Sequence, residues 1–237
     1  MPVKKGSTNF GSLYIGSTKI AKAYLGSILV FGATPQPSSV TIDGKVYPAT
    51  TINGRAWTTV NLDYKYSGFT FYTEDTPGMS AISPPDSGMY YNYTTTPGDT
   101  GLLYNRQAVM ELASIIPTVA PGWQVPTQSD WQQLFAAVGG SSVAGLKLKS
   151  TTGWTNNGNG DGSTSFNALP VGIAVPSGLD HALFGNDGKE TGFWSRTYDG
   201  NGTQRINISY YFTNTGDGAY LRRTNAHWLS VRLVYKG

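Results

Sequence analysis

Cysteine is absent from this chain of 237 residues. Without thiols the protein cannot form disulfides, thiolate metal sites or a cysteine nucleophile, so its stability has to come from packing. Charge is also scarce, because charged residues make up 13% of the chain and the net charge is +3. The nearest approach to a basic patch is Arg222 and Arg223, and two arginines are too few for a nucleic-acid-binding surface.

The sequence also has no long apolar run, and its first residues do not resemble a secretion signal. A membrane-spanning helix needs about 20 consecutive apolar residues, and no run in the sequence approaches that length. The opening residues, MPVKKGSTNFGSLY, contain two lysines but neither an apolar core nor a small-residue cleavage site. We therefore expect no membrane insertion and no signal peptide in this sequence.

Turn-forming and aromatic residues are abundant instead. The 30 glycines, 13 prolines and 13% aromatic residues are typical of a β-rich globular protein with many turns. Within residues 10–32, YIGS returns ten residues later as YLGS. Short apolar strands that alternate with Gly-Ser turns predict a small β-meander. About three such strands are too few to be stable alone, so this segment packs either on a partner chain or on its own domain.

Composition divides the chain into three parts. Residues 1–34 are the predicted N-terminal β segment, which we expect to attach or oligomerise the protein. Residues 35–40 are a linker rich in proline and serine. Residues 41–237 form the main domain, predicted to bind a ligand.

Two hairpins and a first helix are predicted early in the main domain. Asp43-Gly44 and Asn53-Gly54 supply the positive φ angles that tight hairpin turns need. Residues 103–115 are expected to form a helix that stops before a proline. Further strands are expected later in the chain, over residues 166–175, 192–198, 205–212 and 228–237.

The best-marked helix follows Thr127. The Thr127 hydroxyl can cap the helix, and Asp130, three residues on, can return the bond. The helix ends at a glycine pair, and we expect it to be a packing element without chemistry. Its apolar residues recur at helical spacing on one face, at Trp131, Leu134, Phe135 and Val138.

Several motifs in a consistent order resemble the Fibrobacter major paralogous domain family. GWQVPTQSDWQQLFAAVGG, at residues 122–140, is similar to the GWHVPT-x-x-EW motif of that family. The resemblance covers roughly residues 41–237. Its other motifs are TINGRAWTTVNL, AGLKLKSTTGW, FNALPVG, FWS and SVRLV.

This family resembles the C-type lectin fold in its broad form, which formylglycine-generating enzymes share. The implied fold class is α+β, with two helices bracing a twisted antiparallel sheet with long loops, after the small β-meander. Formylglycine-generating enzymes use cysteine chemistry, which this chain lacks, and the calcium motifs of animal C-type lectins are missing. A fold by itself assigns no activity.

The segment from residue 192 to residue 234 carries a second resemblance, to the variable regions of retroelement-diversified proteins of phages and bacteria. That resemblance implies a fixed frame, residues 193–195 and 230–232, with changeable surface residues between. Independently, Tyr, Asn, Ser, Gly and Arg are the residues that paratopes use; an ordinary solvated sheet face is the alternative. The predicted ligand-binding residues are Arg196, Tyr198, Asn201, Arg205, Asn207, Tyr210, Tyr211, Arg222, Arg223, Asn225 and His227.

No catalytic site, metal site or cofactor is predicted. Asn157, Asn159 and Asp161 resemble the start of a calcium loop, but the twelfth position is Ala168 rather than an acid. An acid precedes His181, but a Ser-His-Asp site depends on geometry that a sequence cannot supply.

Together these features favour a non-enzymatic receptor-binding protein, namely a phage tail-fibre protein whose variable C-terminal face binds a host cell-surface protein or glycan. The N-terminal segment would join it to tail or baseplate proteins, as a homo-oligomer that we expect to be a trimer, within the virion. The alternative is a bacterial surface adhesin or polysaccharide-binding module at the cell surface. An enzyme of the formylglycine-generating type is disfavoured because cysteine is absent, and no nucleophile-elbow motif supports a hydrolase.

Overall fold

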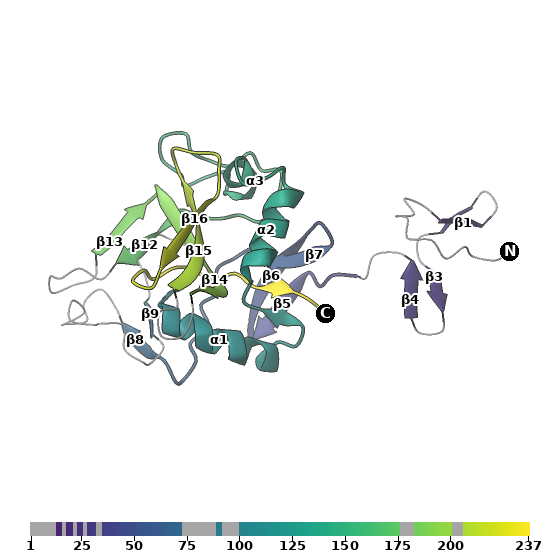
Figure 1. The fold of residues 1–237 in the computed structure, drawn as a ribbon, viewed down its shortest axis with the longest axis horizontal. Helices are drawn as coiled ribbons and strands as arrows, with labels where there is room; N and C mark the ends of the chain where they lie inside the picture. The colour runs from purple at the N-terminus through teal and green to yellow at the C-terminus, as the bar shows by residue number, and fades with distance from the viewer. Residues whose placement is uncertain are drawn as a thin grey trace. The chain divides into compact units, whose positions relative to one another are not determined.

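The chain divides into two compact units, Met1–Gln36 and Pro37–Gly237. The computed structural model describes four short strands of the first unit and most of the second (Figure 1). From the linker onward the described residues are 35–72, 89–91, 100–175, 183–200 and 206–237.

The strands of the N-terminal unit pair as two separate antiparallel hairpins. The predicted β-meander is therefore wrong, because a meander would join its strands in one sheet. Alternating strands and turns indicate where strands occur but do not determine which of them share a sheet. The hairpins are β1 (Leu13–Ile15) with β2 (Thr18–Ile20), and β3 (Ala23–Leu25) with β4 (Ile28–Phe31).

The main unit contains two curled five-stranded sheets. The first has the strand order β11-β17-β7-β6-β5 and is antiparallel throughout. Its strands are β5 (Ser39–Ile42), β6 (Lys45–Ile52), β7 (Arg55–Thr58), β11 (Trp123–Gln124) and β17 (Val234–Tyr235).

The second sheet has the order β13-β12-β14-β15-β16, and within it only β12 and β14 pair in parallel. Its strands are β12 (Val171–Val175), β13 (Leu183–Asp187), β14 (Glu190–Asp199), β15 (Ile206–Thr213) and β16 (Tyr220–Thr224). A smaller sheet holds β8 (Thr70–Tyr72), β9 (Met89–Tyr91) and β10 (Leu103–Tyr104).

The expected α+β C-type lectin-like fold, with two helices bracing one twisted sheet, is wrong. The unit is mostly β, and its described residues hold three short helices beside two large curled sheets and one small sheet. A capped amphipathic helix shows only that one of its faces is buried, and the number of sheets that it contacts is decided in three dimensions. The helices are α1 (Arg106–Val119), α2 (Gln128–Ala137) and α3 (Ala144–Leu148).

The predicted hairpin turns are confirmed, unlike the predicted fold class. Asp43 and Gly44 have φ angles of 50° and 77°, and Asn53 and Gly54 have 48° and 75°. Positive φ at both central residues is the signature of a type I′ turn, and these turns join β5 to β6 and β6 to β7. Both predicted hairpins are therefore confirmed.

The helix predictions differ in accuracy. The capping box of α2 is confirmed, because the Thr127 hydroxyl accepts from the Asp130 amide and Asp130 accepts from the Thr127 amide. The first helix was predicted to stop before Pro117, but α1 continues to Val119. Pro117 lies in the last turn, which the Ala120 amide closes by donating to the Ile116 carbonyl at 2.8 Å.

Helix α2 packs against both large sheets (Figure 1). The buried Trp131 ring lies 5.1 Å from Trp57 of β7, centroid to centroid, and 5.6 Å from Phe193 of β14. This cluster, which we call the α2 core, is separate from a second one, the α1 core, around Val109 and Leu112. A single aromatic side chain on α2 therefore joins the two sheets.

The C-terminal segment also joins the sheets. It was predicted as one strand over residues 228–237, but only Val234–Tyr235 forms one. Before β17 the segment crosses between sheets, because Trp194 of β14 donates to the Ser230 carbonyl at 3.1 Å and Thr58 of β7 donates to the Leu233 carbonyl at 3.0 Å. A strand prediction fails here because the segment pairs with two sheets in turn.

The carboxylate of Asp130 anchors α2 to the first sheet. Its side chain is fully buried, and it accepts from Arg55 at 2.6 Å and from Lys236 at 2.7 Å. Burial alone would raise the pKa of Asp130, but hydrogen bonds from Lys236 and Thr127 outweigh it and hold the pKa below its usual value.

We predict that Asp130→Asn lowers the free energy of unfolding at pH 7 by about 1–3 kcal/mol. The lowered pKa means that the carboxylate stabilises the fold above its unfolded pKa of about 3.9, and that this contribution is lost as the pH falls through the lower folded pKa. Urea unfolding at pH 7 and pH 3 should show the gap between wild type and variant closing at low pH. Asp43→Asn, on an exposed turn, is the control, and an equally large loss there would refute the assignment.

Candidate functional site

The residues expected to form a fixed frame are buried. Each of the six, at positions 193–195 and 230–232, is at most 1% exposed. Phe193 and Trp194 point to opposite faces of β14, the first into the α2 core and the second into the α1 core. The Trp194 indole donates to the Tyr104 carbonyl at 2.7 Å. Burial of these residues on both faces makes β14 a rigid support for the exposed side chains beside it.

Arg232 is the most unusual member of this frame, because it is a buried cation. Its guanidinium donates to Asn61 Oδ1 at 2.6 Å and to the carbonyls of Thr58, Phe166 and Asn167 at 2.7–2.9 Å. All four acceptors are neutral, and burial lowers the pKa of Arg232. The planar fork of arginine suits this role, since it places several donors in fixed directions.

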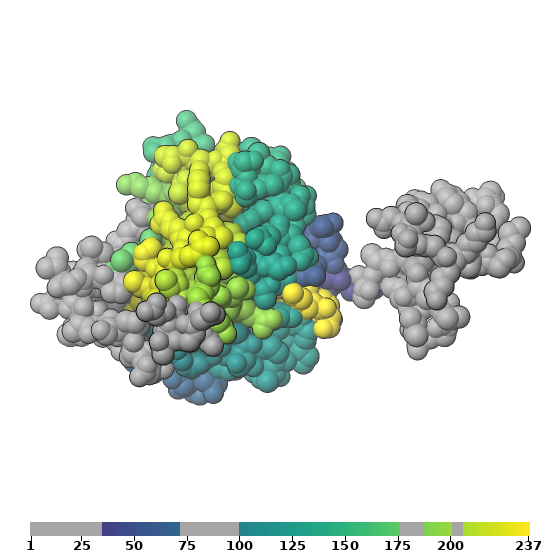
Figure 2. All heavy atoms as spheres, viewed as in Figure 1, coloured from purple at the N-terminus to yellow at the C-terminus, as the bar shows by residue number. Residues whose placement is uncertain are grey.

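Exposed side chains gather beside this frame, along β16 and the paired ends of β14 and β15. Because β16 is the last strand of its sheet, four of its five residues are exposed and the fifth is half-buried. Figure 2 shows its yellow atoms as part of a continuous surface stripe. We call this surface the C-terminal edge; it consists of Tyr198, Ile206, Tyr220, Leu221, Arg222 and Arg223.

The structure separates the eleven predicted binding residues into four groups. Three are exposed on the C-terminal edge, three are half-buried, three are buried, and two lie outside the described residues. In that order the groups are Tyr198, Arg222 and Arg223; Arg196, Asn225 and His227; Asn207, Tyr210 and Tyr211; and Asn201 and Arg205.

Three of the predicted binding residues are buried, because β15 is covered on both faces. Tyr210 points into the α2 core, where its ring lies 5.0 Å from Phe135. Asn207 points toward α1 and accepts from Arg106 at 3.1 Å. Tyr211 belongs to the α1 core. Residue type suggested a binding surface, but the packing on the two faces of β15 makes these side chains part of the interior.

A polar cluster borders the C-terminal edge. The Tyr211 hydroxyl lies 2.6 Å from His227 Nδ1, Arg222 stacks 4.3 Å from the Tyr211 ring, and Arg222 also pairs with Glu190 at 3.1 Å. Burial raises the pKa of Tyr211, whereas burial and the charge of Arg222 lower the pKa of His227. The hydrogen bond between the Tyr211 hydroxyl and the His227 ring holds the two side chains together beside Arg222.

A bulge in β14 directs Tyr198 outward. The pairing of β14 with β15 shifts register between Trp194 and Tyr198, and bulges re-aim side chains in this way. Arg196, within the bulge, donates to the Gln124 side chain and to the Pro126 carbonyl, both at 2.8 Å. Arg196 thus ties the bulge to the segment before α2.

Sequence reasoning missed Ile206, Tyr220 and Leu221, which are 37–47% exposed. Exposure of both faces of a strand is the signal of an edge strand, but a sequence cannot show which strand ends a sheet. Arg223 at this edge pairs with Asp199 at 2.7 Å, which lowers the pKa of Asp199. Charged side chains on an edge strand also oppose pairing with another chain.

The calcium-like loop holds its shape with protein partners. Asp161 accepts from Lys147 at 2.5 Å, which lowers its pKa to about 2. Asn159 accepts from the Trp154 amide at 3.1 Å. Within the described ranges no cluster of three acids or histidines could hold a metal ion, while His181 lies outside them. No helix in those ranges is long and apolar enough to cross a membrane.

Fold and site together define a mostly β scaffold that carries an exposed, arginine- and tyrosine-bearing edge on a buried frame. Residues 50–235 match the model of the Fibrobacter succinogenes major domain. The match spans most of the chain, so this protein belongs to that family. Searches of curated proteins and of solved structures gave no match.

Proposed function

We propose that this protein is a non-enzymatic ligand-binding protein that presents the C-terminal edge to a host cell-surface protein or glycan. The observation that carries the proposal is the division between a frame at most 1% exposed and an adjoining edge strand that is almost wholly exposed. Tyrosine and arginine are the residues that dominate binding energy at protein interfaces. A rigid support also limits the entropy lost when such side chains become ordered on binding.

The biological setting that we propose is the tip of a phage tail fibre. In that setting the C-terminal edge would be diversified by a retroelement, since substitutions at exposed edge positions leave the frame intact. The N-terminal unit would join tail or baseplate proteins and form a homotrimer within the virion. Several copies on one tail would raise the effective concentration of each weak contact.

A bacterial surface adhesin or polysaccharide-binding module is the second candidate. It is supported by the exposed rings of Tyr198 and Tyr220, because amphipathic aromatic rings suit surfaces that are part apolar and part wet. Neighbouring tail genes and a reverse transcriptase gene would favour the phage protein. An upstream secretion or lipid-anchor signal would favour the adhesin.

We predict that Tyr198→Ala, Tyr220→Ala and Arg223→Ala, combined in one variant, weaken binding to intact host bacteria by at least about tenfold. The measurement is binding of the fluorescently labelled full chain to a panel of candidate hosts. Because these side chains are exposed, the variant should keep the wild-type unfolding midpoint.

The matched control replaces two exposed apolar residues elsewhere, Val46 and Val119, by alanine. The control should bind as the wild type does. Equal binding by the wild type and the triple variant, on cells that the wild type does recognise, would rule out the C-terminal edge as the recognition surface.

A further inference from the structure

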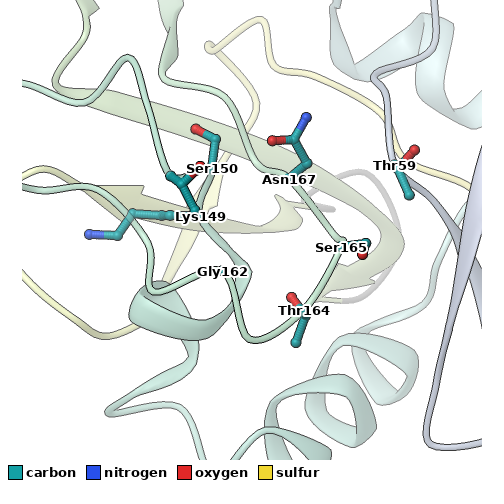
Figure 3. A pocket seen from close by; sticks show the side chains of 8 residues that line it. Thr59, Lys149, Ser150, Gly162, Thr164, Ser165 and Asn167 are labelled. Carbon is teal, nitrogen blue, oxygen red and sulfur yellow. The ribbon is translucent and has the colours of Figure 1, made fainter.

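Two adjoining hollows lie away from the C-terminal edge, on either side of the loop that precedes Phe166. Their volumes are about 510 and 370 Å³, and both are lined by Thr164 and Ser165. The larger is bounded by residues 50–53 and by the end of α2. The smaller is bounded by Thr59, residues 149–151 and Asn167 (Figure 3). No residue of the C-terminal edge lines either hollow.

Hydroxyl and amide groups dominate the lining. Each hydroxyl offers one donor and two acceptor positions, and each amide offers both kinds. Several of these groups make no side-chain hydrogen bond to any described residue, so they are free to bind a ligand. They belong to Thr50, Thr51, Asn53, Thr151, Ser165 and Asn167.

The cations in the lining are already engaged. Lys147 pairs with Asp161 at 2.5 Å. The Lys149 ammonium donates to the carbonyls of Thr213 and Gly216, each at 3.1 Å, and in Figure 3 it is directed away from Thr59. No acid or aromatic residue of the described chain lines the hollows. The lining therefore matches a neutral ligand rich in hydroxyl groups.

Hydrogen bonds to buried or helical residues hold the lining of the two hollows in place. Arg232 donates to the carbonyls of Phe166 and Asn167, directly after the loop. The Thr164 hydroxyl donates to the Lys147 carbonyl at 2.6 Å, which fixes the loop to α3. Preorganised polar groups lose little entropy when they bind. Ile52 and Val138 add an apolar strip to the larger hollow, which suits the C–H face of a sugar ring.

We propose that the two hollows form one groove that binds a neutral saccharide chain, with adjacent sugar units on the two sides of Thr164 and Ser165. Hydroxyl pairs on the sugar would exchange hydrogen bonds with the serine, threonine and asparagine side chains. Because no aromatic ring from the described residues lines the groove, binding is weak for each chain. The groove is independent of the C-terminal edge, so this proposal does not rest on the proposed function.

The test is a titration of the isotopically labelled full chain with cellohexaose, maltohexaose and mannohexaose, each to about 10 mM, followed by amide chemical shifts. At least one hexaose should shift amides of residues 50–53 and 162–167, with a Kd of roughly 0.1–5 mM. Thr51→Ala combined with Ser165→Ala removes two of the free hydroxyls and should weaken that binding about tenfold. Amide chemical shifts outside the two hollows that match those of the wild type would show that this variant is folded.

The controls separate this site from the C-terminal edge. The Tyr198, Tyr220 and Arg223 triple-alanine variant should bind the hexaose as the wild type does. The Thr51 and Ser165 double-alanine variant should bind host cells as the wild type does. The proposal is overturned if none of the three hexaoses shifts the groove amides, if the shifts fall only on the C-terminal edge, or if the double-alanine variant binds the hexaose unchanged.

Discussion

Replacing Arg232 with alanine is expected to lower the free energy of unfolding by about 3–5 kcal/mol. The substitution deletes hydrogen bonds to the Asn61 side chain and to the carbonyls of Thr58, Phe166 and Asn167. Each of these acceptors then loses a donor, and an unsatisfied buried polar group costs about 1–3 kcal/mol. Arg232 also stacks on Phe166, at 4.8 Å from the ring centre, so packing is lost together with the charge.

Urea or guanidinium unfolding of the full chain measures this effect. Arg232→Lys keeps a charge but not the planar fork, so its stability should fall between those of wild type and alanine variant. Arg223→Ala, on the exposed edge with a side chain 53% accessible, should change stability by less than about 1 kcal/mol. A loss at position 232 no larger than at position 223 would show that the buried network does not stabilise the fold.

Trp131→Ala is the second substitution with a large expected effect, a loss of about 3–5 kcal/mol. The Trp131 ring is fully buried and contacts residues of both large sheets, at centroid distances of 5.1 Å to Trp57 and 5.6 Å to Phe193. Removing it leaves a cavity where the sheets meet on α2. The indole also donates to the Trp194 carbonyl at 3.3 Å, so this backbone acceptor loses one donor.

Gln132→Ala, at the next and exposed position of α2, is the matched control, and it should leave the unfolding midpoint within about 0.5 kcal/mol of wild type. Trp131→Phe keeps part of the ring and should lose less stability than alanine does. If Trp131→Ala unfolds in one cooperative transition with wild-type stability, α2 does not join the two sheets energetically.

Much of the local structure can be predicted from short stretches of sequence. The Asn53-Gly54 turn and the Thr127–Asp130 capping box form as predicted, because each depends on a few residues next to one another. The predicted end of α1 is wrong because Pro117 sits in the last turn of the helix rather than beyond it. There the missing amide removes a single bond, and tertiary packing of Ile116 in the core outweighs it.

Residue type alone does not predict which residues of the candidate site are exposed. Tyr198 and Arg223 were selected for their residue types and are exposed, but Tyr210 and Tyr211 have the same chemistry and are buried. The difference comes from packing, since the α1 core and the α2 core cover the two faces of β15, whereas four of the five residues of β16 are exposed. This packing depends on contacts between residues far apart in the chain, which a single sequence does not reveal.

The sequence by itself determined the family, the hairpin turns, the capped helix and the absence of thiol chemistry. These features depend on residue identity or on neighbours within a few positions. Only the tertiary structure decided that the helices lie beside two large curled sheets rather than one. It also decided that Arg232 is a buried cation with neutral acceptors, and that the exposed surface lies on β16. Those outcomes depend on which distant segments pack together, and packing is fixed by the shape of the whole core.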